Sequence, residues 1–156
     1  MLMQRMQRTF IAIKPDAVQR ELIGEIITKI ERKGFKIIGM KMLHLTKEMA
    51  HAHYAEHIGK PFFDDLVRFI TSGPIVAMVV QGVNVIEETR RIMGRTRPEE
   101  SEQGSTRAEY AQSKRSNIIH GSDSYESAER EIALYFKEDE LCTNWETTSE
   151  EFLRKY

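Results

Sequence analysis

Short apolar runs rich in β-branched residues recur along the chain and indicate buried strands. The run RTFIAIK at 8–14 stops at Pro15, and IVAMVV at 75–80 is the clearest strand pattern. FKIIGMKMLHL at 35–45 is also apolar, although its alternation is imperfect, and NIIH at 117–120 predicts a short fourth strand. The chain therefore offers four strands to one sheet.

Between these runs, apolar residues recur three and four positions apart, which is typical of amphipathic helices. Start and stop signals flank several of these stripes, such as Thr46 as an N-cap and Gly34 as a C-cap. Helices are thus predicted over 23–30, from Thr46 to about His57, over 63–70, from Asn84 to near Gly94, and over 124–136.

The order β-α-β-α-α-β-α-β-α predicts one α/β domain over 1–156, with helices packed on a single sheet. Alternation of strands with helices favours a parallel sheet. The polar segment 95–116 shows no periodicity and is predicted to be a long loop, either functional or disordered. The last twenty residues, which include Trp145, are too apolar for a free tail and are expected to dock on the body or on another subunit.

Composition narrows the class of protein. The 156 residues are 40% hydrophobic and 30% charged, which is ordinary for a globular domain. The net charge of −1 offers no global basic field for nucleic acid, so any anion site must be local. The single Cys142 excludes an intrachain disulfide, and the opening MLMQRMQRTF has no apolar leader region. We expect a cytoplasmic protein that does not cross a membrane.

The segment NIIHGSDS at 117–124 carries the most suggestive chemistry. Asp123 and Glu126 have capping-box spacing, which places His120 just before a helix N-terminus that favours an anion. Imidazole titrates near pH 6.5 and can attack a phosphorus atom without a separate base. A rate that falls as acid protonates the ring is then expected. By itself, however, a lone histidine here is more often a strand-end residue bonded to a cap.

Four segments together make the chain similar to the nucleoside diphosphate kinases. They are RTFIAIKPDAVQR, KPFFDDLVRFITSGPIVAMV, GVNVIEETRRIMG and NIIHGSDSYESAEREI, which span about 8–137 in the family's order. The resemblance implies a ferredoxin-like α+β sandwich with a four-stranded antiparallel sheet covered by helices. That expectation replaces the parallel sheet. It also implies homo-oligomers built from dimers, a hexamer first and a tetramer second.

The resemblance further implies ping-pong transfer of the γ-phosphate of ATP, or another nucleoside triphosphate, to a nucleoside diphosphate. His120 matches the histidine that the family phosphorylates on Nδ1, supported by Ser122 and Glu131, with Tyr54 near the ring. The nucleotide contacts match Lys14, Phe62, Leu66, Arg90, Thr96, Arg107 and Asn117.

Physical chemistry agrees with these matches. Arg90 and Arg107 can fork onto phosphate oxygens, and stacking on Phe62 is worth about 1–3 kcal/mol whatever the base. The chain lacks the glycine-rich phosphate loops and a carboxylate cage for metal, so Mg²⁺ is expected to arrive with the nucleotide phosphates. Two segments depart from the family pattern: Ala108-Glu109-Tyr110 replaces Gly-Asp-aromatic, and Ser113-Lys114-Arg115-Ser116 replaces a run that commonly contains glycine.

Other interpretations stay open at this point. A nucleotide-binding or single-stranded nucleic-acid-binding module on the same scaffold is the alternative function, although the strands lack the aromatic RNA-binding pattern. A protein-histidine kinase or transcription-linked side role is undecided. His53 and His57 have metal-ligand spacing, but with His51 they are better explained as a solvated helix face. Of Phe62 and Phe63, one should leave the core and enter a cleft.

Overall fold

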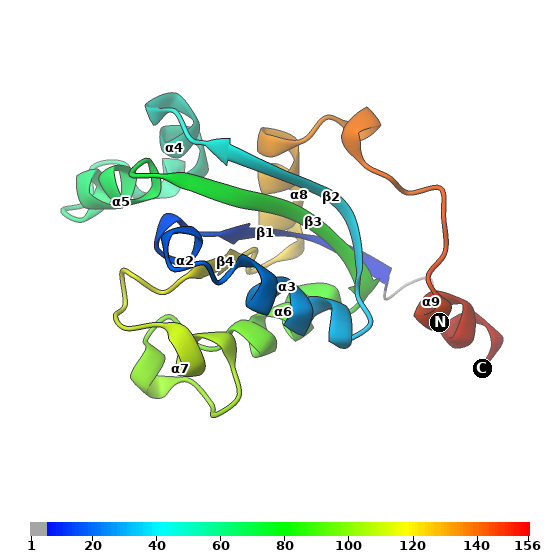
Figure 1. Ribbon diagram of the computed structural model, residues 1–156. Coiled ribbons are helices and arrows are strands. Elements are labelled where there is room, and N and C mark those ends of the chain that lie inside the picture. Colours follow the sequence, from blue (N-terminus) through cyan, green and yellow to red (C-terminus); the bar gives the residue numbers. More distant parts are fainter. Residues whose placement is uncertain (1–5) are drawn as a thin grey trace.

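Four antiparallel strands form the central sheet of the computed structural model, which describes residues 6–156 (Figure 1). They are β1 (Met6–Ile13), β2 (Lys36–His44), β3 (Pro74–Val83) and β4 (Ile119–Gly121), in the spatial order β2-β3-β1-β4. Residues 1–5, on which the absence of a leader and the start of the 1–156 domain were argued, lie outside this description.

The parallel sheet expected from element order is wrong, and the antiparallel sheet expected from the resemblance is confirmed. β3 pairs antiparallel with β1, from Met6 opposite Val83 to Ile13 opposite Val76, and its other edge pairs antiparallel with β2. β1 and β2 consequently run in the same direction, but they are not neighbours. Local periodicity cannot reveal that β3, a later strand, inserts between them.

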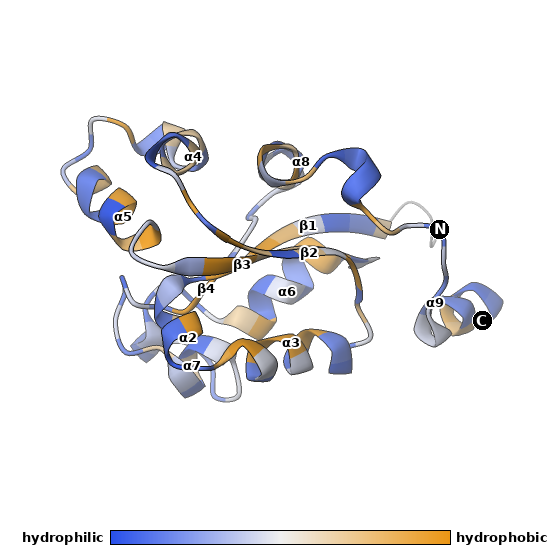
Figure 2. Ribbon diagram, turned by 45° about the horizontal axis from the view of Figure 1, so that its top comes forward, coloured by the Kyte–Doolittle hydropathy of each residue, from blue (hydrophilic) through white to orange (hydrophobic). Residues whose placement is uncertain are grey.

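Helices cover both faces of this sheet. Their bounds are α2 (Pro15–Gln19), α3 (Ile23–Arg32), α4 (Lys47–His53), α5 (Phe63–Ile70), α6 (Val85–Met93), α7 (Thr106–Tyr110), α8 (Tyr125–Tyr135) and α9 (Thr148–Lys155). In Figure 2, α4, α5 and α8 lie over one face, while α2, α3 and α6 lie over the other with apolar stripes toward the sheet. None of the helices within residues 6–156 is long and apolar enough to cross a membrane.

Alternation along β1 explains how one short strand serves two cores. Phe10 and Ala12 face the α4–α5–α8 layer, whereas Ile11 and Ile13 face the α2–α3–α6 layer. All four side chains are buried, which is the pattern of a strand covered on both sides. Because β1 lies between β3 and β4, it places the residues just beyond its end, beginning with Lys14, next to β4.

The imperfect alternation of the second strand has a structural cause. The register of β2 against β3 shifts between Ile37 and Gly39, which marks a bulge that turns the later residues over. At Gly39, a Cβ would lie 2.8 Å from the side chain of Leu141, so only glycine fits there without rearrangement. Beyond the bulge, Met40 and Met42 are exposed on the free edge of the sheet.

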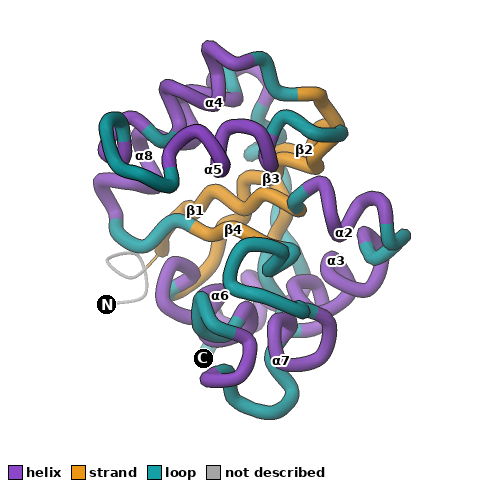
Figure 3. Tube along the Cα trace, turned by 90° about the vertical axis from the view of Figure 1, so that its left-hand side faces the viewer, coloured by secondary structure: helices purple, strands orange, loops and turns teal. Residues whose placement is uncertain are grey.

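The polar segment 95–116 is ordered. It contains a 3₁₀ turn at Pro98–Glu100 and the short helix α7, which Ser105 caps by accepting a hydrogen bond from the Ala108 backbone N–H. Figure 3 shows β1 and β4 side by side between the α4–α5–α8 layer and the layer that contains α6 and α7. Both α7 and α2 are too short to show a helical period in sequence, so neither was predicted.

The C-terminal segment docks on the body, which confirms one of its two expected placements. The buried Lys36 amino group lies 3.4 Å from Glu150 of α9 and is bonded to the backbone oxygen of Trp145. Glu150 also accepts a hydrogen bond from Gln81. Beyond these anchors, Phe152 and Tyr156 remain exposed.

Candidate active site

His120 lies in the middle of β4, opposite Ala12 of β1, and the chain then passes directly into α8. Ser124 caps that helix by accepting a hydrogen bond of 3.1 Å from the Ser127 backbone N–H. The cap therefore forms one residue later than the predicted capping box of Asp123 and Glu126. The prediction that a histidine stands just before a helix N-terminus is confirmed.

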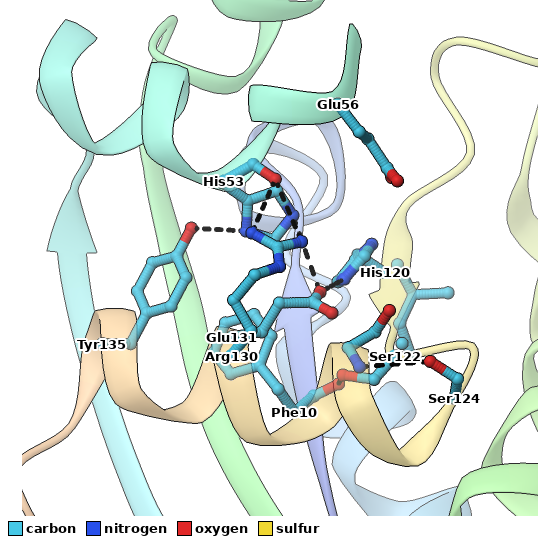
Figure 4. Close-up of polar contacts among 12 residues, drawn as sticks. Phe10, His53, Glu56, His120, Ser122, Ser124, Arg130, Glu131 and Tyr135 are labelled. Atoms are coloured by element: carbon cyan, nitrogen blue, oxygen red, sulfur yellow. Dashed lines mark hydrogen bonds and ion pairs between the residues drawn. The ribbon is translucent and has the colours of Figure 1, made fainter.

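One nitrogen of the His120 ring is held and the other is free of protein partners. Nε2 is hydrogen-bonded to Oε1 of Glu131, which projects from α8 two turns along the helix (Figure 4). Within residues 6–156, Nδ1 has no hydrogen-bond partner. Ser122 stands behind this pair, fully buried, and its hydroxyl donates a hydrogen bond of 3.5 Å to the Phe10 carbonyl oxygen. The arrangement fixes the tautomer, with the proton on Nε2 and the lone pair on Nδ1.

The surroundings keep the ring neutral. Burial, followed by the positive charges of Lys14 and Arg107, lowers the pKa of His120 far below its ordinary value. Burial likewise raises the pKa of Glu131. We therefore expect acid to slow the reaction only at a pH well below about 6.5, the ordinary pKa of imidazole.

His53 is not on a solvated helix face, which corrects the sequence-based interpretation. Its side chain is 6% exposed, its ring centroid is 4.7 Å from that of His120, and its Nδ1 is 3.0 Å from the Tyr135 hydroxyl. Its Nε2 lies 3.8 Å from Oε1 of Glu131. A signal was present: His53 follows the buried Ala50 by three residues, on the inner stripe of α4.

His53, His120 and Glu131 form the one three-residue group within the described part of the chain that could hold a metal ion. Its two nitrogens and single carboxylate suit zinc better than magnesium, which prefers oxygen ligands. Lys14 and two arginines also place positive charge beside it. The group is therefore better described as a hydrogen-bonded support for the His120 ring than as a magnesium site.

Lys14 is a buried cation that lines the same cavity as His120. Its amino group donates a hydrogen bond of 2.7 Å to the side-chain oxygen of Asn117. Burial and the nearby Arg107 lower its pKa to about 7, and Asp16 opposes that shift. A lysine with a pKa near neutral pH becomes more fully protonated when an anion binds beside it.

Arg107 is braced by backbone carbonyl groups. Its guanidinium donates hydrogen bonds to the carbonyl oxygens of Asn117, Gly94 and Ile119, at 3.2, 3.2 and 2.6 Å. Burial and the charge of Arg90 lower its pKa to about 10, so it stays charged at neutral pH. Arg90 is held in turn by the carbonyl oxygen of Gly121, at 3.0 Å.

The backbone just before His120 is strained. Ile118 has a φ of +63°, although it is a buried β-branched residue. The distortion lets its N–H donate to Asp16 at 3.1 Å and its carbonyl accept from the Lys14 N–H at 2.9 Å. Such strain costs about 1–3 kcal/mol and persists only where the surroundings impose it. It links the segment after β1 to the segment that carries Asn117 and His120.

One cavity of about 880 Å³ gathers nearly all the predicted residues. Its lining includes Lys14, Tyr54, Phe62, Leu66, Arg90, Thr96, Arg107, Asn117, His120 and Glu131. Ser122 is outside the lining because it is fully buried behind Glu131. Phe62 is 42% exposed while the adjacent Phe63 is buried, so the expected division between cleft and core is confirmed.

Tyr54 lies at the junction of this lining and the histidine support. Its ring packs edge-on against that of His53, with centroids 4.7 Å apart. Burial and the charge of Glu131 raise the pKa of its hydroxyl to about 12, so the group stays protonated and can donate a hydrogen bond.

Comparisons with known proteins identify the family to which this fold belongs. The family model described as nucleoside diphosphate kinase matches residues 7–141. A nucleoside diphosphate kinase of Heliobacterium modesticaldum is 54% identical over 148 residues, 95% of this chain and 99% of its own length. A solved nucleoside diphosphate kinase of Halobacterium salinarum in complex with CDP is 46% identical, has a TM-score of 0.90, and is matched over 94% of this chain and 97% of that one. The corresponding structure from Babesia bovis also has a TM-score of 0.90, at 43% identity over 94% of this chain and 99% of that one.

Proposed function

This chain belongs to the nucleoside diphosphate kinase family, and we propose that its phosphotransfer proceeds through a phosphohistidine at His120. The overall activity is transfer of a phosphoryl group from a nucleoside triphosphate to a nucleoside diphosphate. In the proposed ping-pong route, ATP is the typical donor, and the enzyme carries its γ-phosphoryl group between two nucleotides. Such an enzyme maintains the pools of ribo- and deoxyribonucleoside triphosphates.

The observation that carries this mechanism is the held Nε2 and free Nδ1 of His120. The Nδ1 lone pair attacks the γ-phosphorus, the bond to the β–γ bridging oxygen breaks, and the diphosphate leaves. The Nε2 proton stays on the ring and donates to Glu131, which stabilises the positive charge that the ring gains. In the second half, a β-phosphate oxygen of the acceptor attacks phosphorus, the N–P bond breaks, and neutral imidazole returns.

The cations of the cavity supply the stabilisation that phosphoryl transfer requires. We assign Lys14, Arg90, Arg107 and Thr96 to the phosphate oxygens. Negative charge spreads over these oxygens in the transition state, and donors that are already in place need not reorganise when it develops. We assign the hydroxyl of Tyr54, which lines the same cavity, to the neighbourhood of the attacking ring. Because Arg107 is braced by three carbonyl groups, it is a fixed donor of this kind.

The other end of the cavity is assigned to the nucleoside. The exposed ring of Phe62 is the platform for the base, and Leu66, one turn further along α5, lines the same cleft. Asn117, already bonded to Lys14, is assigned to the sugar. Stacking on one aromatic face accepts purines and pyrimidines alike.

The family generally uses a divalent metal ion, and we propose Mg²⁺ carried by the nucleotide phosphates. The lining suits this arrangement because its donors toward phosphate are nitrogen cations, while the one candidate metal cluster within residues 6–156 offers two imidazoles and one carboxylate. When bound, Mg²⁺ would neutralise part of the charge on the β- and γ-phosphate oxygens.

We further propose that the 156 residues form one domain that assembles in the cytoplasm as a homo-oligomer, hexameric rather than tetrameric. The exposed Met40 and Met42 on the free sheet edge support an interface between subunits. Light scattering coupled to gel filtration measures the number of subunits, and a stable monomer would contradict the proposal.

Trapping the phosphoenzyme tests the mechanism. Incubation with γ-labelled ATP should give an acid-labile, alkali-stable label that GDP discharges, and His120→Ala should take up none. We expect turnover to fall by on the order of 10⁴-fold or more, since no other group replaces the nucleophile. His51→Ala, which removes an exposed histidine, is the matched control and should label normally. Labelling and turnover by His120→Ala would contradict the proposed mechanism.

A further inference from the structure

An ion pair spans the base end of the cavity. Nη2 of Arg115 lies 3.3 Å from Oδ2 of Asp65, and it joins the segment 113–116 to α5. Arg115 and its three neighbours in this segment all line the cavity. The segment is also one of the two places where the chain departs from its family's pattern. The mechanism above uses none of these four residues.

The anchor of this pair stands beside the proposed base platform. Asp65 follows Phe62 by three residues, so the two side chains emerge on the same face of α5. A guanidinium held by Asp65 therefore lies on the face of α5 that carries the Phe62 ring, and the cation over that ring is Lys60 rather than Arg115. A group in that position meets the edge of a stacked base and leaves its face to the phenyl ring.

Asp65 holds a second arginine that provides an internal comparison. Nη2 of Arg68 lies 3.2 Å from Oδ1 of Asp65, and Arg68 is not among the residues that line the cavity. The two arginines thus share one carboxylate, but only Arg115 lines the site. Because the pair between Arg115 and Asp65 uses Nη2, other N–H groups of the Arg115 guanidinium remain available as donors.

We propose that Arg115 is a specificity-determining residue that favours bases with an oxygen, rather than an amino group, at purine position 6 or pyrimidine position 4. The proposal rests on the placement of the base at Phe62 in the proposed function. Guanine offers O6 and N7 as two acceptors to one guanidinium, and uracil offers O4. Adenine and cytosine present an amino donor at these positions, which a guanidinium cannot accept.

Arg115 would then add a modest base preference to a site in which stacking on Phe62 accepts any base. Stacking on Phe62 cannot separate the four bases, since each has a π-face. A charged hydrogen bond can separate them, but solvent weakens it because the Arg115 side chain is 54% exposed. The preference for guanine over adenine and that for uracil over cytosine each rest on one exocyclic oxygen, because guanine and adenine share N7 as an acceptor.

The experiment measures the second half-reaction alone, so that the donor base plays no part. Phosphoenzyme made with labelled ATP is freed of nucleotide and mixed with GDP, ADP, UDP or CDP in a rapid-quench instrument. The second-order discharge rates give two ratios, GDP to ADP and UDP to CDP. Wild type, Arg115→Ala, Arg115→Lys and Arg68→Ala are compared in this way.

Arg115→Ala should lower the ratio of GDP to ADP by about threefold to tenfold, the range of a partly screened charged hydrogen bond. The ratio of UDP to CDP should fall by a comparable factor. Arg115→Lys keeps the charge with a single donor group and should give intermediate ratios, whereas Arg68→Ala should leave both ratios unchanged.

Two outcomes would overturn the inference. Either both ratios stay within a factor of two of wild type in Arg115→Ala, or all four acceptors slow equally, which would make Arg115 a stacking or loop-holding group. Failure of the proposed function is distinguishable, since wild type would then form no phosphoenzyme or would discharge it to none of the four acceptors.

Discussion

The two ends of the cavity are built by different means. At the phosphate end, Lys14, Arg107 and His120 are each held by hydrogen bonds to the protein, and the cations are buried. At the base end, Phe62 and Arg115 are largely exposed and come from α5 and from an irregular segment. The chain thus holds the groups assigned to the phosphate in fixed positions and leaves room for the base to vary.

Removing a fixed donor should have the largest effect. We expect Arg107→Met to lower kcat/KM by about 10²- to 10³-fold, as for the loss of one preorganised transition-state donor. The same change removes one donor from the carbonyl oxygens of Gly94, Asn117 and Ile119, of which that of Asn117 keeps the Ile119 N–H as a partner. It should lower the unfolding free energy by about 1–3 kcal/mol. Steady-state kinetics and thermal unfolding measure the two effects.

Arg91→Met is the matched control, because Arg91 is the neighbour of Arg90 on α6 but is exposed and paired with Glu87 and Glu88. It should change neither quantity appreciably. Equal losses of kcat/KM and of stability in Arg107→Met and Arg91→Met would contradict the proposal that the phosphate end is preorganised.

Removing the platform should have an intermediate effect. Phe62→Ala should raise KM about tenfold for every acceptor, the lower part of the range for stacking, because the ring is partly exposed. The limiting rate should change much less, since the ring is remote from the phosphorus atom. Kinetics with GDP, ADP, UDP and CDP test this, and Phe62→Leu separates the aromatic face from mere bulk. A selective loss for one base would contradict the assignment.

A smaller effect should appear with pH. Lys14, whose pKa is lowered to about 7, is charged below that pH and neutral above it, so kcat/KM should fall several-fold as pH rises through this region. Bound phosphate restores the charge, so kcat should fall less. On the acid side, the lowered pKa of His120 keeps the nucleophile neutral, so the rate should stay flat from pH 7 to about 5.

The acid limb should then report the coupled pair of His120 and Glu131 rather than either residue alone. Rates of phosphoenzyme formation between pH 4.5 and 9 would show both limbs. A decline centred near 6.5 on the acid side would mean that the ring titrates as an unperturbed histidine.

Local patterns predicted most of the elements, whereas the site residues were predicted as a set only by the resemblance to a known family. The stripe of 63–70 and the alternation of 8–14 are short-range features, and the structure contains both. The direction of the sheet was beyond pattern alone, because β3 joins β1 and β2 through contacts between residues far apart in sequence.

The support behind the candidate site was hidden for the same reason. Arg107 is braced by three carbonyl groups from two separate segments, and the positive φ of Ile118 follows from bonds to Asp16 and Lys14. His53 was assigned to solvent because it is one of three histidines on one predicted helix that lacked further metal ligands in sequence, yet α4 turns it against Glu131. Each of these features depends on tertiary contacts that no single segment encodes.

In the proposed mechanism, Glu131 holds Nε2 of His120 and thereby directs the phosphoryl group to Nδ1. Phosphoenzyme prepared with ¹⁵N-labelled histidine allows ³¹P–¹⁵N coupling to be measured directly by NMR. We expect the coupling at Nδ1, with the proton retained on Nε2, and coupling at Nε2 would contradict the account.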